Sequence, residues 1–168
     1  HSLPSRRPSD LYATMSGPIV YGNWVLITGV WDQNNIYFYH NSTLLGQTAL
    51  SGNLITGTFN GETVIGNSGA HFNGPFDGHI SFCAIWDTAL TQQEIQNYMN
   101  CPPTGNESGL VGYWNFEEGT GGTAYDQTSN GNNGTIYGAT YDSLNVPTQS
   151  CALTNTNGCD STAVLNLT

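Results

Sequence analysis

The fold of this chain is decided by one stretch, Phe72-Asn-Gly-Pro-Phe-Asp-Gly-His-Ile-Ser-Phe-Cys-Ala-Ile-Trp-Asp-Thr-Ala-Leu-Thr-Gln-Gln-Glu-Ile95. It predicts a loop, then a buried strand, then one short helix. Thr91 is the expected N-cap, and Glu94 follows three residues later, so each can satisfy a backbone N–H of the other. Leu90 and Ile95 can close over this start as a hydrophobic staple. A single helix in a chain of short strands and Gly/Asn turns indicates a β-sandwich.

Short apolar runs elsewhere predict the other strands of the sandwich. Residues 25–31 carry apolar side chains on both faces, which is typical of a central strand. Residues 32–35 (Asp-Gln-Asn-Asn) predict a turn, and residues 36–40 return as the partner strand of a hairpin. Further strands are expected over residues 11–15, 41–46 (after a tight turn), 62–66, 80–86, 110–116 and 135–141.

Several motifs carry a resemblance to a known family. Besides the opening stretch they are residues 109–121 (Gly-Leu-Val-Gly-Tyr-Trp-Asn-Phe-Glu-Glu-Gly-Thr-Gly), 125–136, 138–141, and 24–32 with 36–41. Together they cover most of residues 20–142, and they resemble the laminin-G-like jelly rolls of the concanavalin-A-like group, which includes pentraxins. The resemblance implies an all-β fold, a two-sheet antiparallel jelly-roll sandwich with one short helix.

The chain is expected to have three parts. Residues 1–10 differ in composition from the rest and are interpreted as a non-native or disordered N-terminus. Residues 11–146 are assigned to the sandwich. Residues 147–168 form a tail, either the start of a following repeat or an added edge strand. Because the family has strands before the segment that matches residues 24–32, the resemblance implies one of two expectations. Either the chain is a truncated or permuted copy, or it leaves sheet edges bare and forms a homo-oligomer through them.

Charge excludes several classes of partner. The chain has twelve Asp and Glu residues and only two cationic ones, Arg6 and Arg7, which gives a formal net charge of −10. Nucleic acid binding needs Lys and Arg to neutralise phosphates, so nucleic acid is not expected as a partner. No apolar run is long enough to span a bilayer, so membrane insertion is not expected either.

The four cysteines are Cys83, Cys101, Cys151 and Cys159. An even number in an acidic, Gly/Asn-rich chain favours a secreted or cell-surface, extracytoplasmic location. Cys83 lies in an apolar strand, so it is either a small buried hydrophobic residue or half of a disulfide. The pairing among the four stays open.

The sequence does not carry the carboxylates that glycan hydrolysis requires. The hydrolytic sandwiches of the concanavalin-like group place them along one strand as Glu-x-Asp-x-(x)-Glu, and no such run is present. No catalytic residue is therefore expected. The alternative, a small glycoside hydrolase that uses loop groups, would depend on Asp77, Glu117 and His79, which are otherwise ordinary loop and turn residues.

Calcium is a candidate cofactor, since family members often bind it. Ca²⁺ takes six or more oxygen ligands from a flexible loop. The candidates are Glu117, Asp126, Asn130, Asn132 and Asp142. The alternative is a loop of Asx turns held by its own side-chain hydrogen bonds.

A glycan or cell-surface polysaccharide is the expected ligand. A sugar site combines an aromatic platform with amide and carboxylate partners on loops. The candidates are Trp31, Tyr37, Tyr39, Asn67, His71, Phe72 and Asn73. Tyr37 and Tyr39 could instead pack across strands on the outer face of the sheet. The sequence thus favours a non-catalytic carbohydrate-recognition or adhesion module of a larger secreted bacterial protein, with a hydrolase or a structural spacer repeat as the alternatives.

Overall fold

The structure is a computed structural model that describes residues 22–49, 63–67, 76–142, 147, 153–154 and 160–161. It divides into two compact units, His1–Asn53 and Leu54–Thr168. The expected N-terminal segment 1–10, the strand at 11–15, and the candidates His71, Phe72 and Asn73 lie outside the described residues.

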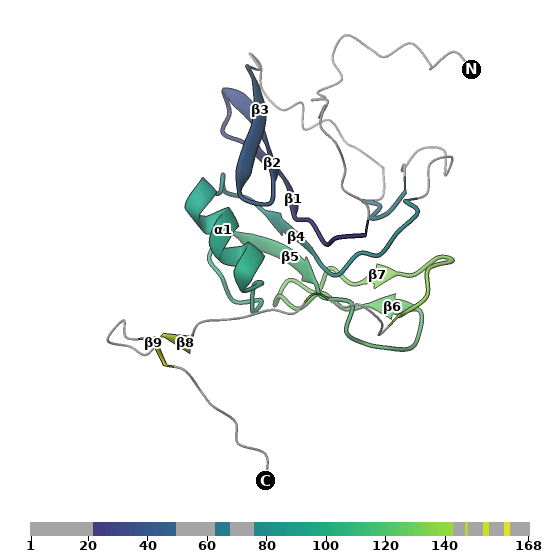
Figure 1. Ribbon diagram of the computed structural model, residues 1–168. Helices are drawn as coiled ribbons and strands as arrows, with labels where there is room; N and C mark the ends of the chain where they lie inside the picture. Colours follow the sequence, from purple (N-terminus) through teal and green to yellow (C-terminus); the bar gives the residue numbers. More distant parts are fainter. Residues whose placement is uncertain are drawn as a thin grey trace, which may run out of the picture. The chain divides into compact units, whose positions relative to one another are not determined.

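The first unit contains a three-stranded antiparallel sheet (Figure 1). Its strands, in spatial order, are β1 (Ile27–Trp31), β2 (Asn35–His40) and β3 (Thr43–Ala49). The β1–β2 turn is made by Asp32, whose carboxylate accepts the backbone N–H groups of residues 34 and 35 at 2.9 and 2.7 Å. The predicted hairpin is confirmed.

The register of this sheet shows which face is buried. Val30 lies opposite Tyr37, and Thr28 lies opposite Tyr39. Directly opposite residues share a face, and Val30 and Tyr39 are each only 8% exposed. Tyr37 and Tyr39 therefore occupy the buried face, and not the outer face that the alternative interpretation assigned to them. Every residue of β3 is exposed, but the predicted oligomer through a bare edge remains a prediction.

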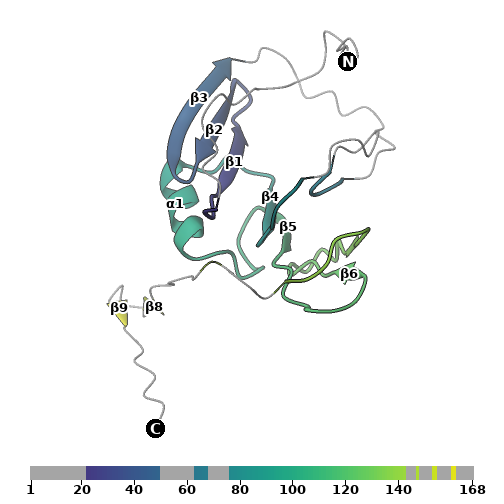
Figure 2. The same ribbon diagram turned by 45° about the vertical axis from the view of Figure 1, so that its right-hand side comes forward.

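The second unit is built around β4 (Cys83–Trp86), α1 (Gln92–Asn100) and β5 (Leu110–Trp114). The capping box predicted for α1 is confirmed. The Thr91 N–H donates to Glu94 Oε2 at 2.7 Å, and the Glu94 N–H donates to Thr91 Oγ1 at 3.3 Å. Figures 1 and 2 show β4 and β5 paired as antiparallel neighbours, in agreement with their register.

Apolar side chains from all three elements form the core of this unit. Ile95 of α1 is 1% exposed, and Leu110, Tyr113 and Trp114 of β5 are 6–8% exposed. The ring of Trp86 on β4 packs against that of Tyr98 on α1 with centroids 4.9 Å apart. Burial of a large apolar side chain contributes about 1.5–3 kcal/mol, so the spacing of Ile95 and Tyr98 on one helix face holds α1 against the strands.

The remaining described strands are short. β6 (Thr123–Ala124) pairs with β7 (Gly134–Thr135), and β8 (Leu153–Thr154) pairs with β9 (Asp160–Ser161). The strand expected at 135–141 ends at Thr135. The strand expected at 62–66 is wrong for its described residues, 63–66, which do not form one. Gly66 adopts φ +79° and its carbonyl accepts the Phe76 N–H, so the chain turns there.

The architecture agrees with the predicted fold class. In the described ranges, all strand pairing is antiparallel, and α1 is a single short helix of nine residues. None of the described helical residues form a helix of the length and apolarity that crossing a bilayer requires.

Candidate functional site

The connection between β6 and β7 is organised by the carboxylate of Asp126, which is 9% exposed. Oδ1 accepts the backbone N–H groups of Tyr113 and Thr128 at 3.0 and 2.9 Å. Oδ2 accepts the Thr128 hydroxyl at 2.8 Å and the Asn132 N–H at 2.9 Å. A carboxylate offers about four acceptor positions, so protein donors occupy all of them.

The same bonds set the ionisation of Asp126. Burial by itself raises its pKa, but the hydrogen bonds from the backbone of Tyr113, Thr128 and Asn132 outweigh it. The pKa of Asp126 therefore lies below its ordinary value of 3.8. A charged, fully bonded carboxylate ties strand β5 to the loop of residues 126–133, which is the role of a structural Asx turn.

Three of the other proposed calcium ligands, all except the exposed Glu117, are also engaged in protein contacts. Asn130 and Asn132 both donate from Nδ2 to the Val111 carbonyl at 2.9 Å. Asp142 lies 3.1 Å from Nε2 of His79. In the described part of the chain, no group of three or more His, Cys, Asp or Glu side chains could hold a metal ion. Asp126 could bind calcium only by giving up bonds that it already makes, so the geometry favours the self-bonded loop; the calcium site stays a prediction.

Tyrosines on the β6–β7 ribbon form a solvent-facing aromatic surface. Thr123 pairs with Thr135, and Ala124, which is 6% exposed, pairs with Gly134. Tyr125 directly follows β6, and Tyr137 lies two residues after the end of β7. Exposure alternates along both segments: Ala124 and Asp126 are buried and Ile136 is half-buried, whereas Tyr125, Thr135 and Tyr137 are exposed. Side chains that alternate in this way point to opposite sides, so Thr123, Tyr125, Thr135 and Tyr137 lie on the side away from Ala124. Tyr125 is 53% exposed and Tyr137 is 83% exposed. We call these four side chains the tyrosine face.

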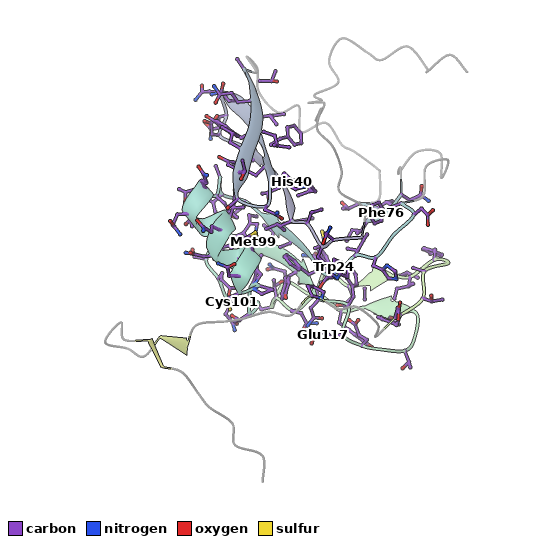
Figure 3. All side chains as sticks on the ribbon, in the orientation of Figure 1. Trp24, His40, Phe76, Met99, Cys101 and Glu117 are labelled. Carbon is purple, nitrogen blue, oxygen red and sulfur yellow. The ribbon has the colours of Figure 1, made fainter. Side chains whose placement is uncertain are left out.

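Glu118 supports this ribbon from the segment between β5 and β6. Its Oε1 accepts the Tyr125 N–H at 2.7 Å, and its Oε2 accepts the Tyr141 hydroxyl at 3.0 Å. The Tyr141 hydroxyl also lies 3.3 Å from the Thr123 carbonyl oxygen. The neighbouring Glu117, labelled in Figure 3, is exposed. The exposed face therefore stands on backbone that is already held by hydrogen bonds.

Sequence reasoning missed Tyr137 because residues 135–141 were expected to be a strand of the sandwich, and it did not single out Tyr125. The available signal was the alternation of Thr123, Ala124 and Tyr125, in which a small apolar residue separates two larger polar ones. Gly138, which adopts φ +76°, was a second signal that a long strand would not continue there.

The glycan candidates in the first unit have different settings. Tyr39 is buried, so its ring offers little surface to a sugar. The Tyr37 hydroxyl donates to Asp32 Oδ2 at 2.8 Å, and this bond raises the pKa of Tyr37 and lowers that of Asp32. Trp31 is half-buried, and its indole Nε1 is buried without a hydrogen-bond partner. Asn67 lies in the second unit.

The alternative catalytic residues lie in exposed positions of the second unit. Asp77 and Glu117 are both exposed. His79 forms its contact with Asp142, and the side chains of this pair are 63% and 37% exposed. A glycosidase needs two carboxyl groups opposed across the scissile bond, and nothing in the geometry of these three residues shows that arrangement.

The structure gives the state of two of the four cysteines. Cys101, the C-cap of α1 (labelled in Figure 3), is disulfide-bonded, whereas Cys83 is a free thiol. Burial raises the pKa of the Cys83 thiol, which fits the interpretation as a small buried hydrophobic residue. Cys151 and Cys159 lie outside the described residues.

Comparison with known proteins identifies a family. The model of a laminin-G-type family, described as the concanavalin A-like lectin/glucanases superfamily, matches residues 4–96. The match includes β1 to β4 and begins inside the N-terminal segment that was interpreted as non-native. A search of curated proteins found no match.

A solved structure is also similar, the crystal structure of an S-layer domain-containing protein from Clostridium thermocellum. The identity is 22% and the TM-score 0.44, over 52% of this chain and 44% of that one. This chain thus spans less than half the length of that protein chain. The family match, in contrast, covers more than half of the residues, and the chain therefore belongs to the concanavalin A-like lectin/glucanases superfamily.

Proposed function

We propose that this protein is a non-catalytic carbohydrate-recognition or adhesion module of a secreted or cell-surface protein. The observation that carries the proposal is the exposure of aromatic rings in the second unit. Tyr125 is 53% exposed and Tyr137 is 83% exposed. Exposed aromatic residues on ordered backbone are a recognised form of binding surface, because they add contact area at low cost in side-chain entropy.

The charge of the protein argues against an anionic ligand. The chain carries a net charge of −10, and its two arginines are at positions 6 and 7. A sulfated glycan or a uronic acid polymer would be repelled. A neutral sugar offers hydroxyl groups to carboxylate and amide acceptors, and apolar ring faces to the aromatic residues.

Two further observations support the proposed extracytoplasmic location and the proposed non-catalytic role. The disulfide at Cys101 is of the kind that persists in oxidising, extracytoplasmic compartments. The carboxylates Asp77 and Glu117 are both exposed, whereas substrate sites are concave and bury most of the ligand.

A glycan array tests the function. The protein should bind one or more uncharged glycans, and the signal should change little between low and high salt because no ion pairs form. An EDTA arm tests the calcium prediction separately, since a calcium-dependent site would lose its signal. Absence of binding to every glycan would refute the proposal and favour a structural spacer.

A further inference from the structure

We propose that the tyrosine face is the binding site for an extended, uncharged polysaccharide chain that contacts Tyr125 and Tyr137 at the same time. The inference rests on the proposed function, and it specifies the site and the form of the ligand. It concerns the second unit alone.

The register sets the distance between the two rings along the ribbon. The Ile136 N–H donates to the Gly122 carbonyl at 2.9 Å, so the pairing continues one step beyond Thr123 and Thr135. Tyr125 lies two residues after Thr123, and Tyr137 lies two residues after Thr135. Because the two strands are antiparallel, the two tyrosines lie on opposite sides of the Thr123–Thr135 pair along the ribbon. Four residues of antiparallel strand span about 14 Å. A monosaccharide cannot reach both rings, whereas a chain of several sugars can.

The shape of the surface argues for a chain as well. A small ligand needs a concave site that buries most of its surface. Tyr137 is 83% exposed and Tyr125 is 53% exposed, so each ring stands out from the ribbon and offers a single contact. A ligand that spans both rings gains affinity from two weak contacts, because the first contact raises the effective concentration of the ligand at the second ring. The two threonine hydroxyls between the rings can bond with sugar hydroxyls.

The face is pre-organised. The Tyr125 N–H is held by Glu118 at 2.7 Å, and the Asp126 N–H donates to Asn133 Oδ1 at 3.0 Å, directly beside Gly134 of β7. Both strands therefore keep their spacing before a ligand arrives. A tyrosine side chain has only two rotatable angles to fix, so ordering the rings costs little.

Charge at the face decides the class of polysaccharide. Glu117 and Glu118 lie in the segment that supports the ribbon, and the described residues contain no Lys or Arg. Phosphate, sulfate and uronic acid groups would be repelled, whereas hydroxyl groups can donate to these carboxylates. A cationic chain is the competing ligand, because carboxylates and tyrosine rings also attract cations.

Calorimetric titration of the full chain with defined oligosaccharides tests the site. The probes are cellobiose and cellohexaose, mannobiose and mannohexaose, and the fully deacetylated chitosan hexamer as the cationic arm. We expect a neutral hexasaccharide to bind at least about tenfold more tightly than its disaccharide. Tyr125→Ala and Tyr137→Ala should each weaken hexasaccharide binding about tenfold, and Tyr137→Phe should retain most of it.

Phe76→Ala is the matched control, because Phe76 is an aromatic residue of similar exposure to Tyr125 but lies off the ribbon. It should leave the affinity unchanged. Unchanged urea midpoints would show that the tyrosine variants remain folded.

If the protein binds glycans on the array but both alanine variants keep full affinity, the site is wrong and the proposed function stands. If disaccharide and hexasaccharide bind equally, the two-ring contact is refuted, and preference for the cationic chain that weakens with salt refutes the uncharged ligand. No binding to any glycan means that the proposed function itself fails.

Discussion

Replacing Asp126 by asparagine should destabilise the protein strongly while changing its shape very little. The carboxylate accepts four hydrogen bonds, from the N–H groups of Tyr113, Thr128 and Asn132 and from the Thr128 hydroxyl, at 2.8–3.0 Å. An asparagine can keep the two bonds at the oxygen position. At the other position its amide nitrogen would face the Asn132 N–H, so that two donors meet. The Thr128 hydroxyl can rotate to accept, but the Asn132 N–H cannot.

The expected loss of stability follows from the number of hydrogen bonds that are lost or weakened. A buried donor left without a partner costs about 1–3 kcal/mol, and a hydrogen bond to a charged group is worth about 1 kcal/mol more than a neutral one. One lost donor and two weakened bonds give a loss of about 3 kcal/mol in the free energy of unfolding. For a chain of this size, that corresponds to a fall in Tm of about 10 °C.

Urea denaturation followed by tryptophan fluorescence measures the effect, since Trp114 is 8% exposed and its indole N–H donates to the Asn132 carbonyl at 2.9 Å. Asp77→Asn is the control, because it removes the same charge from an exposed position and should cost little. A loss below about 1 kcal/mol for Asp126→Asn would refute the reasoning, because it would mean that these bonds add nothing to those made with water. A wild-type Tm that rises with Ca²⁺ and no longer does so in Asp126→Asn would instead identify the carboxylate as a metal ligand.

Three further predictions concern single positions. The pKa of Asp126 is lowered in the fold, so the contribution of its carboxylate to stability is complete above the unfolded pKa of about 3.9 and is lost as the pH falls through the folded pKa. Urea midpoints measured over a series of acidic pH values should show this loss in the wild type and not in Asp126→Asn. Gly105→Ala should cost about 2 kcal/mol or more, because Gly105 adopts φ +100° and an added Cβ would overlap the Gln127 carbonyl oxygen; a thermal melt that is unchanged would show that the loop relaxes freely. Thr91→Ala removes the N-cap of α1 and should cost about 1 kcal/mol by chemical denaturation, with Thr91→Ser close to the wild type.

Local signals in the sequence predicted the structure well where neighbouring residues make the interaction. The capping box of Thr91 and Glu94 spans three residues, and the Asp32 turn spans four, so the chemistry needed is visible in the sequence itself. The free thiol at Cys83 was one of two open interpretations, because an apolar strand hides a cysteine equally well with or without a partner.

Face assignments failed for a physical reason. A period of two tells which side chains share a face, but it does not tell which face is buried. Tyr37 and Tyr39 were candidates for a sugar platform, with packing on the outer face as the alternative; the register sets Tyr37 opposite Val30, which is buried, so both tyrosines lie on the buried face. The calcium site stays a prediction, and the sequence alone leaves it open. Oxygen-rich loops suit both a cation and their own N–H groups, and only the geometry of Asp126 distinguishes the two uses.

The two main features of the second unit depend on each other. Asp126 directly follows Tyr125, and the loop that it organises leads into β7, which precedes Tyr137. The bonds from Asp126 to Thr128 and Asn132 therefore set the connection between the two strands that carry the rings. A polysaccharide that must contact both rings gains affinity only if their separation is fixed beforehand, since any freedom in the ribbon would be lost on binding. A saturated, buried carboxylate is suited to that task, and a carboxylate held open for a metal ion would leave the ribbon less ordered until the metal arrived. The side-chain hydrogen bonds of Asn130, Asn132 and Asn133 explain why the loop is rich in Asn. Together with the four bonds to Asp126 they explain why the aromatic residues beside the loop can remain exposed without being disordered.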